Sequence, residues 1–90
     1  MRRRLSLRLT GTVQGVNLRH SVRLWAMQQH IGGFVRNEPD GSVTVELEGE
    51  REKLQQAYDW LCTSPGASRV ASCQVRWLEP LGLGDSFNVS

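Results

Sequence analysis

Residues 34–48 read FVRNEPDGSVTVELE and contain two short apolar segments separated by a turn. Over residues 42–48, valine and leucine alternate with polar residues, which is the period of a strand with one buried face. In the turn, Pro39 has a restricted φ angle, and the Asp-Gly pair that follows it favours a tight reversal of the chain. This stretch therefore predicts a β-hairpin.

Strands and helices alternate around this hairpin. Before the hairpin, leucines alternate with polar residues in a first strand. One segment on each side of the hairpin carries apolar residues at helical spacing, and Gly32-Gly33 is expected to end the first of these two helices. The predicted elements are, in order, a strand at 4–11, a helix at 18–31, strands at 34–36 and 42–48, a helix around 54–61, a strand at 70–77 and a short edge piece at 87–89. The β-α-β-β-α-β order predicts an α+β, ferredoxin-like sandwich, with a four-stranded antiparallel sheet and two helices on one face.

The length and composition are those of one small globular domain over residues 1–90. The chain has 39% hydrophobic and 22% charged residues, which argues against a disordered chain or a coiled coil. No apolar run approaches the length of a membrane span. Residues 1–4 read MRRR without the apolar core of a signal peptide after them, so a cytoplasmic protein is expected.

Charge is distributed unevenly along the chain. Residues 1–36 contain seven arginines and no acidic residue, although the net charge of the whole chain is only +2. The basic half suggests that the first half binds an anion. An uneven but merely solvated surface remains the alternative.

The other reactive side chains form no catalytic pattern. Cys62 and Cys73 are not in a CxxC arrangement, so neither zinc nor redox chemistry is indicated, and free buried thiols are expected, with an incidental disulfide as the alternative. His20 and His30 lack a Cys or Ser partner at a suitable spacing and are interpreted as surface or cap residues. The tryptophans fall on apolar faces and are expected in the core: Trp25, Trp60 and Trp77.

The segment GTVQGVNLR at 11–19 joins the first strand to the first helix. Backbone N–H groups of such a loop can converge at the helix N-terminus, where the dipole favours an anion. Arg19 adds a planar guanidinium that fits phosphate oxygens bidentately. The predicted phosphate-binding residues are Gln14, Gly15, Val16, Asn17, Leu18 and Arg19. A structural turn with a solvated arginine is the alternative.

Two motifs resemble those of the acylphosphatase family. Residues 11–19 resemble its first signature, and residues 33–37, followed by 40–43 and Gly49, resemble its second. The likeness extends to the turn at 64–67 and to Phe87. Two departures from the family pattern fall in the loop: Asn17, and Leu18 in place of the usual phenylalanine or methionine, which is expected to face the core.

The resemblance implies a βαββαβ domain that hydrolyses acyl phosphates to a carboxylate and inorganic phosphate without a metal or cofactor. The family's phosphate-binding arginine falls on Arg19, and the asparagine that positions the attacking water falls on Asn37. The residues themselves also allow Asn37 to start the turn as an Asx residue, and both roles could hold together. The expected partners are a small-molecule acyl phosphate and inorganic phosphate as product and inhibitor, and a monomer without membrane contact is expected.

Two other functions compete with hydrolysis. One is a regulatory anion-binding domain with the same fold and low turnover. The other is a nucleic-acid binder that uses Arg2 to Arg4, because RNA-recognition modules share the fold. Such modules stack bases on exposed aromatics of their central strands, whereas residues 5–9 and 43–47 show only aliphatic and polar or charged side chains. Nucleic acid is therefore not expected as a partner.

Overall fold

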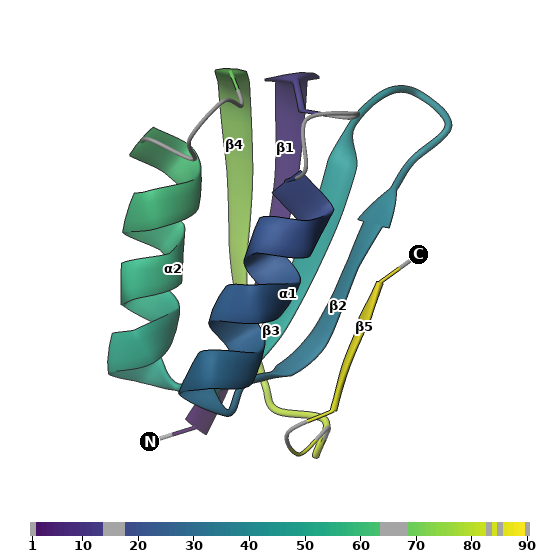
Figure 1. The fold of residues 1–90 in the computed structure, drawn as a ribbon. Coiled ribbons are helices and arrows are strands. Elements are labelled where there is room, and N and C mark those ends of the chain that lie inside the picture. Colours follow the sequence, from purple (N-terminus) through teal and green to yellow (C-terminus); the bar gives the residue numbers. More distant parts are fainter. Residues whose placement is uncertain (1, 14–17, 64–68, 83, 85, 90) are drawn as a thin grey trace.

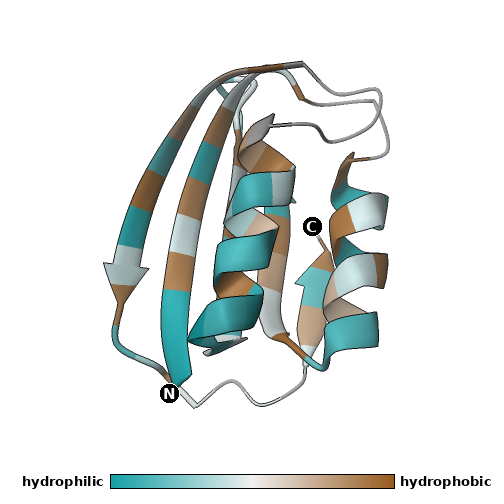
Figure 2. Ribbon diagram, turned by 90° about the vertical axis from the view of Figure 1, so that its left-hand side faces the viewer, coloured by the Kyte–Doolittle hydropathy of each residue, from teal (hydrophilic) through white to brown (hydrophobic). Residues whose placement is uncertain are grey.

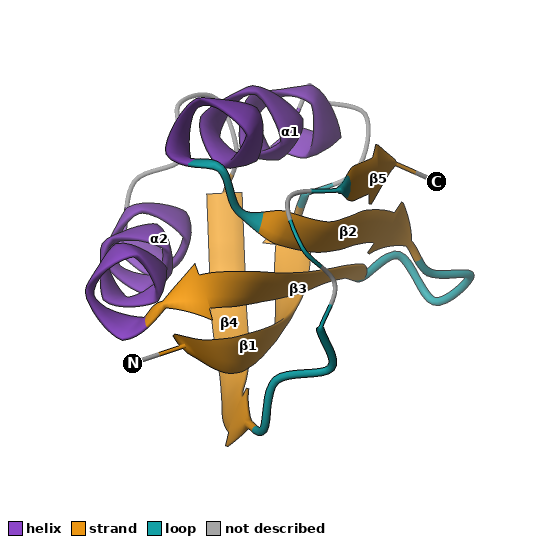
Figure 3. Ribbon diagram, turned by 90° about the horizontal axis from the view of Figure 1, so that it is seen from below, coloured by secondary structure: helices purple, strands orange, loops and turns teal. Residues whose placement is uncertain are grey.

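The described part of the chain forms five strands and two helices in two layers (Figure 1). The computed structural model describes residues 2–13, 18–63, 69–82, 84 and 86–89. In chain order the elements are β1 (Arg2–Thr12), α1 (Leu18–Gln29), β2 (Gly32–Asn37), β3 (Val43–Glu50), α2 (Arg51–Thr63), β4 (Arg69–Leu78) and β5 (Phe87–Val89). Both helices lie on the same face of the sheet (Figure 3), so the predicted sandwich is confirmed.

The sheet has one strand more than the four predicted. Its order is β4-β1-β3-β2-β5, in which the first four strands pair antiparallel and β5 pairs parallel to β2. The Gly33 N–H donates to the Ser86 carbonyl at 2.8 Å as β5 approaches. A Cβ on Gly32 would lie 2.2 Å from the Gly84 carbonyl oxygen, so only glycine admits this close approach. The terminal piece is thus a fifth strand of the sheet.

The core lies between the sheet and the helices, as the alternation of residues predicts. Leu5, Leu7 and Leu9 of β1 are fully buried and stand opposite Leu47, Val45 and Val43 of β3. Figure 2 shows the same alternation of hydrophobic and hydrophilic residues along the strands. Burying each such side chain contributes about 1.5–3 kcal/mol. The helices complete the core with Leu18, Val22 and Ala26 from α1 and Leu54, Ala57 and Leu61 from α2.

Helix α1 ends earlier than the Gly32-Gly33 pair predicts. His30 follows the last helical residue with a left-handed φ of 57°. The Ile31 N–H donates to the Ala26 carbonyl at 2.9 Å, and the His30 N–H donates toward Met27, which together form a Schellman cap. The expectation that glycine ends this helix is therefore wrong, whereas the cap role of His30 is confirmed. Both glycines belong to β2 instead.

The tryptophans lie at the margin of the core rather than inside it. All three are half-buried and pack against the buried cluster. The rings of Trp25 and Trp60 stack between α1 and α2 with centroids 6.3 Å apart. The Arg51 guanidinium lies over the Trp77 ring, 5.2 Å from its centroid. Their polar ring edges and large size suit this boundary position.

The expectation of free thiols is wrong, because Cys62 and Cys73 form a disulfide. Cys73 stands opposite Leu9 in the sheet and therefore points to the helix-covered face, toward the last turn of α2. The two Cα atoms are 5.9 Å apart, within the normal range for a disulfide. The bond joins the end of α2 to β4.

Reduction of this disulfide is expected to destabilise the fold. The cysteines are 11 positions apart, and closing a loop of that size removes about 3 kcal/mol of denatured-state entropy in the chain-entropy account. For a domain of this size, the melting temperature should fall by roughly 10 °C or more on adding dithiothreitol. The measurement is a pair of thermal melts, with Cys62→Ser/Cys73→Ser as a control that should not respond to the reductant. Two titratable thiols in the untreated protein would contradict the bond.

Candidate active site

Three chain segments meet at one end of the molecule. β1 ends there, α1 begins there, and β2, which runs parallel to β1 with β3 between them, ends there too (Figure 1). Arg19 is the second residue of α1, and Asn37 is the last residue of β2. The topology therefore brings the predicted anion-binding helix start and the predicted water-positioning residue to the same end.

Arg19 lies in a helix turn that suits an anion. Its side chain is half-buried, and the first turn of α1 contains no acidic residue, whereas that of α2 contains Glu52. The exposed N–H groups and the dipole make a helix N-terminus partly positive, so an arginine there is unfavourable to the helix by itself. An anion bound at this end would offset that repulsion.

The side chain of Asn37 places a buried oxygen atom at this end of the sheet. It stands opposite Val43, which stands opposite Leu9, and both of these residues are fully buried. Because residues opposite one another share a face of the sheet, the Asn37 side chain points to the helix-covered face. Its Oδ1 atom is buried and has no hydrogen-bond partner within the described structure. Such an atom costs about 1–3 kcal/mol and calls for an explanation.

The turn after Asn37 is closed by another residue. Asp40 Oδ1 accepts hydrogen bonds from the Ser42 N–H at 2.9 Å and from the Ser42 hydroxyl at 2.6 Å. The Glu38 N–H donates to the Ser42 carbonyl at 2.8 Å. The Asx role that Asn37 could have taken therefore belongs to Asp40, and no residue of the described turn bonds to the carboxamide oxygen of Asn37.

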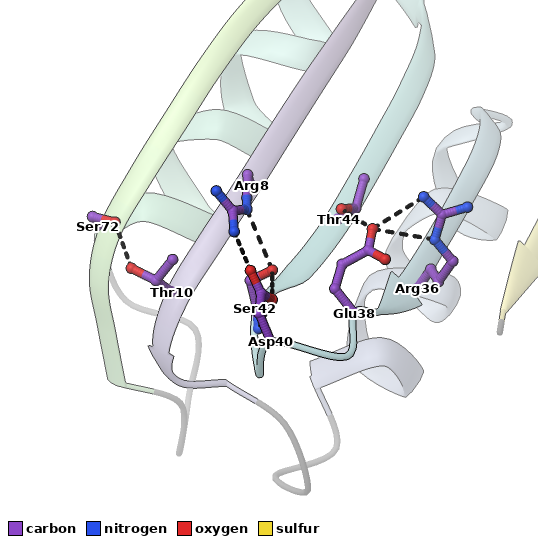
Figure 4. A network of polar contacts seen from close by, with 8 residues as sticks. All are labelled: Arg8, Thr10, Arg36, Glu38, Asp40, Ser42, Thr44 and Ser72. Carbon is purple, nitrogen blue, oxygen red and sulfur yellow. Dashed lines mark hydrogen bonds and ion pairs between the residues drawn. The ribbon is translucent and has the colours of Figure 1, made fainter.

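Ion pairs on the open face of the sheet, which is the face opposite to the helices, stabilise the same turn (Figure 4). Glu38 accepts from Thr44 at 2.7 Å and from the Arg36 guanidinium at 3.0 Å, and these bonds lower the pKa of Glu38. The bonds from Ser42 are the main cause that lowers the pKa of Asp40 to about 2. Because both pKa values are lowered in the folded state, these contacts stabilise the turn at neutral pH, and that contribution is lost as the pH falls through the lowered values.

The remaining predicted residues divide into two groups. Gln14, Gly15, Val16 and Asn17 lie outside the described residues, so their role stays a prediction. Leu18 is only 3% exposed and packs in the core, as expected from its position at the helix start.

The described residues lack two features that would have pointed to other functions. No helix there is long and apolar enough to cross a membrane. In the same ranges, no three His, Cys, Asp or Glu side chains are grouped so that they could hold a metal ion.

Comparisons with known proteins identify the family. The family model described as acylphosphatase matches residues 5–89. An acylphosphatase of Roseiflexus sp. (strain RS-1) is 40% identical over 81 residues, which are 90% of this chain and 87% of that protein. An acylphosphatase of Thermococcus kodakarensis is 40% identical over 86 residues, covering 96% of this chain and 93% of the relative. The crystal structure of acylphosphatase from Bacillus subtilis superposes with a TM-score of 0.88 at 27% identity, covering 100% of this chain and 99% of that one.

The fold thus defines a small α+β domain in which Arg19, at the start of α1, and Asn37, at the end of β2, lie at the same end. The match over nearly the whole length places the domain more narrowly: the chain belongs to the acylphosphatase family. It is a hydrolase of acyl phosphates.

Proposed function

We propose that this chain hydrolyses acyl phosphates by in-line attack of a water that Asn37 orients, on a phosphoryl group that Arg19 and the amides of residues 14–18 hold. The observation that carries the proposal is the buried Oδ1 atom of Asn37, which has no hydrogen-bond partner among the described residues. An acceptor aimed into the molecule at the end where α1 begins suits a water O–H donor. Residues 1–90 act in this proposal as a single domain.

The reaction requires mainly that the protein position the attacking water and stabilise the charge on the phosphoryl group. The water oxygen forms a bond to phosphorus while the bond from phosphorus to the acyl oxygen breaks, and the carboxylate leaves with that electron pair. The proton of the attacking water passes to solvent or to the phosphate product. A carboxylate is a good leaving group, so a neutral carboxamide that orients the water without removing its proton is sufficient. Arg19 stabilises the charge on the equatorial phosphoryl oxygens.

The partners follow from this chemistry. The substrate is a small-molecule carboxylic–phosphoric anhydride. Inorganic phosphate, the product, competes with it for the same phosphate-binding residues. The proposed enzyme works as a monomer in the cytoplasm and requires neither a metal nor a cofactor.

Hydrolysis of benzoyl phosphate tests the reaction, with and without a chelator. We expect full activity in the presence of EDTA and competitive inhibition by inorganic phosphate. Phosphate should also raise the melting temperature, because a ligand that binds only the folded state stabilises it. Stabilisation by phosphate without any turnover at high enzyme concentration would support the anion-binding domain instead, and activity lost to the chelator would contradict the metal-free mechanism.

A further inference from the structure

An ion pair on the open face of the sheet ties the turn after Asn37 to β1. Arg8 of β1 donates from Nη2 to Oδ2 of Asp40 and from Nε to the Ser42 hydroxyl at 3.4 Å (Figure 4). Because β3 lies between β1 and β2, backbone hydrogen bonds do not join these two strands directly. The Arg8 side chain therefore connects β1 with the end of the β2–β3 turn, across the face opposite to the helices.

Asp40 gives this ion pair a rigid point of attachment. Its Oδ1 atom is occupied by the two hydrogen bonds from Ser42, and its Oδ2 atom faces Arg8. The Gly41 N–H donates to the Glu38 carbonyl at 3.1 Å, so the turn between Asn37 and Ser42 is internally bonded as well. A displacement of Asp40 would therefore be transmitted through this short turn to Asn37, three positions before it.

The other partner belongs to the strand that enters the phosphate loop. Arg8 lies within β1, which continues to Thr12 and to the buried Val13, directly before residues 14–17. Its neighbours Leu7 and Leu9 are fully buried, so the backbone that carries Arg8 is fixed in the core. The ion pair thus connects the strand leading to the phosphate loop with the turn that follows the water-positioning residue.

We propose that Arg8 and Asp40 are a positioning pair, which fixes the carboxamide of Asn37 relative to the phosphate loop and thereby sets kcat without touching the substrate. This inference rests on the function proposed above for Asn37. The side chains are 47% and 52% exposed, and exposed ion pairs contribute little to stability. Rates, in contrast, depend steeply on the alignment of the attacking group, because a small misplacement in the site slows the reaction.

The experiment compares kcat, the inhibition constant of phosphate and the melting temperature of matched variants, with benzoyl phosphate as substrate. Asp40→Asn keeps an oxygen for Ser42 but removes the charge that faces Arg8. Arg8→Gln removes the other partner, and Arg8→Lys keeps the charge alone. Arg76→Gln is the control, because Arg76 is an exposed arginine on the same face of the sheet, opposite Ser6, and belongs to β4 rather than to the turn.

We expect Arg8→Gln and Asp40→Asn each to lower kcat by between about threefold and tenfold, with phosphate inhibition unchanged within about twofold. The melting temperature should shift by only a few degrees. The double variant should be no slower than the slower single variant, because both remove the same contact. Arg8→Lys should recover part of the rate, and Arg76→Gln should match the wild type.

Three results would overturn the proposal. Unchanged kcat in both single variants would show that the pair positions nothing. An equal loss in Arg76→Gln would assign the effect to net charge. If kcat falls together with a large fall in melting temperature and in phosphate affinity, the Arg8–Asp40 pair has a structural role instead. Measuring the kcat of Asn37→Ala beside these variants separates the two proposals. If kcat collapses in Asn37→Ala but is unchanged in the Arg8 and Asp40 variants, only the positioning pair is refuted. If kcat is unchanged in Asn37→Ala, both proposals are refuted.

Discussion

Replacing Arg19 by glutamine is expected to abolish hydrolysis and inhibition by phosphate together. In the proposed site the guanidinium of Arg19, at the start of α1, presents two parallel charged donors to phosphate oxygens, whereas glutamine offers only the neutral donors of one amide group. Losing such a group from a site of developing charge costs on the order of 3 kcal/mol or more, equivalent to a factor of about 10² to 10³ in kcat/KM. Steady-state kinetics with benzoyl phosphate and a phosphate titration measure both losses.

Two variants control for charge and for folding. Arg23→Gln removes an exposed arginine one turn further along α1 and should leave the kinetics close to those of the wild type. Arg19→Lys keeps the charge without the planar pair of donors, so it should recover only part of the rate. Far-UV circular dichroism should show α1 intact in all three variants. If Arg19→Gln keeps wild-type affinity for phosphate, the anion binds elsewhere on the molecule.

The strands could be predicted because one face of each is buried. The alternation at residues 4–11 and 42–48 matches the buried residues of β1 and β3, with polar and charged side chains on the open face. The end of α1 could not be predicted in the same way, because a glycine signal has more than one physical cause. A Cβ on Gly33 would lie 1.9 Å from the Glu46 carbonyl oxygen, so this glycine serves strand packing while His30 caps the helix.

The spacing of residues along the sequence could not predict contacts between distant parts of the chain. The Cys62–Cys73 disulfide depends on where α2 ends relative to the register of β4. The Arg8–Asp40 ion pair joins residues 32 positions apart. Neither has a local pattern, because each depends on tertiary placement rather than on periodicity or turn chemistry.

The residues of the candidate site were predicted on different grounds. Glycines and an arginine between a strand and a helix indicate an anion site on physical grounds alone. Asn37, in contrast, was selected through the family motif, since its residue type equally suits a turn. The register supports the water-positioning proposal, because pairing with Val43 turns the side chain to the helix-covered face, where the described turn residues do not use its oxygen.

Replacing Asn37 by alanine should lower kcat by a factor of about 10² or more while the inhibition constant of phosphate changes little. In the proposed mechanism the carboxamide orients water in the transition state, and this substitution leaves the proposed phosphate-binding residues unchanged. Stability should not fall with activity, because the variant removes a buried acceptor that has no partner in the described structure. An unchanged or higher melting temperature beside a collapsed kcat is therefore the expected signature. Asn88→Ala, an exposed asparagine on the neighbouring β5, is the matched control and should leave both quantities unchanged.

Asn37→Asp makes the test sharper, because it keeps the shape and an acceptor but adds a negative charge near the phosphoryl group. Repulsion should then weaken phosphate binding as well as turnover, whereas alanine affects turnover alone. This difference between the two variants distinguishes a residue that faces the reacting atoms from one that only supports the turn. If the folded Asn37→Ala protein keeps its kcat, the buried oxygen does not orient the attacking water. Hydrolysis would then need a different water-positioning group, and the mechanism proposed here would be wrong at its central step.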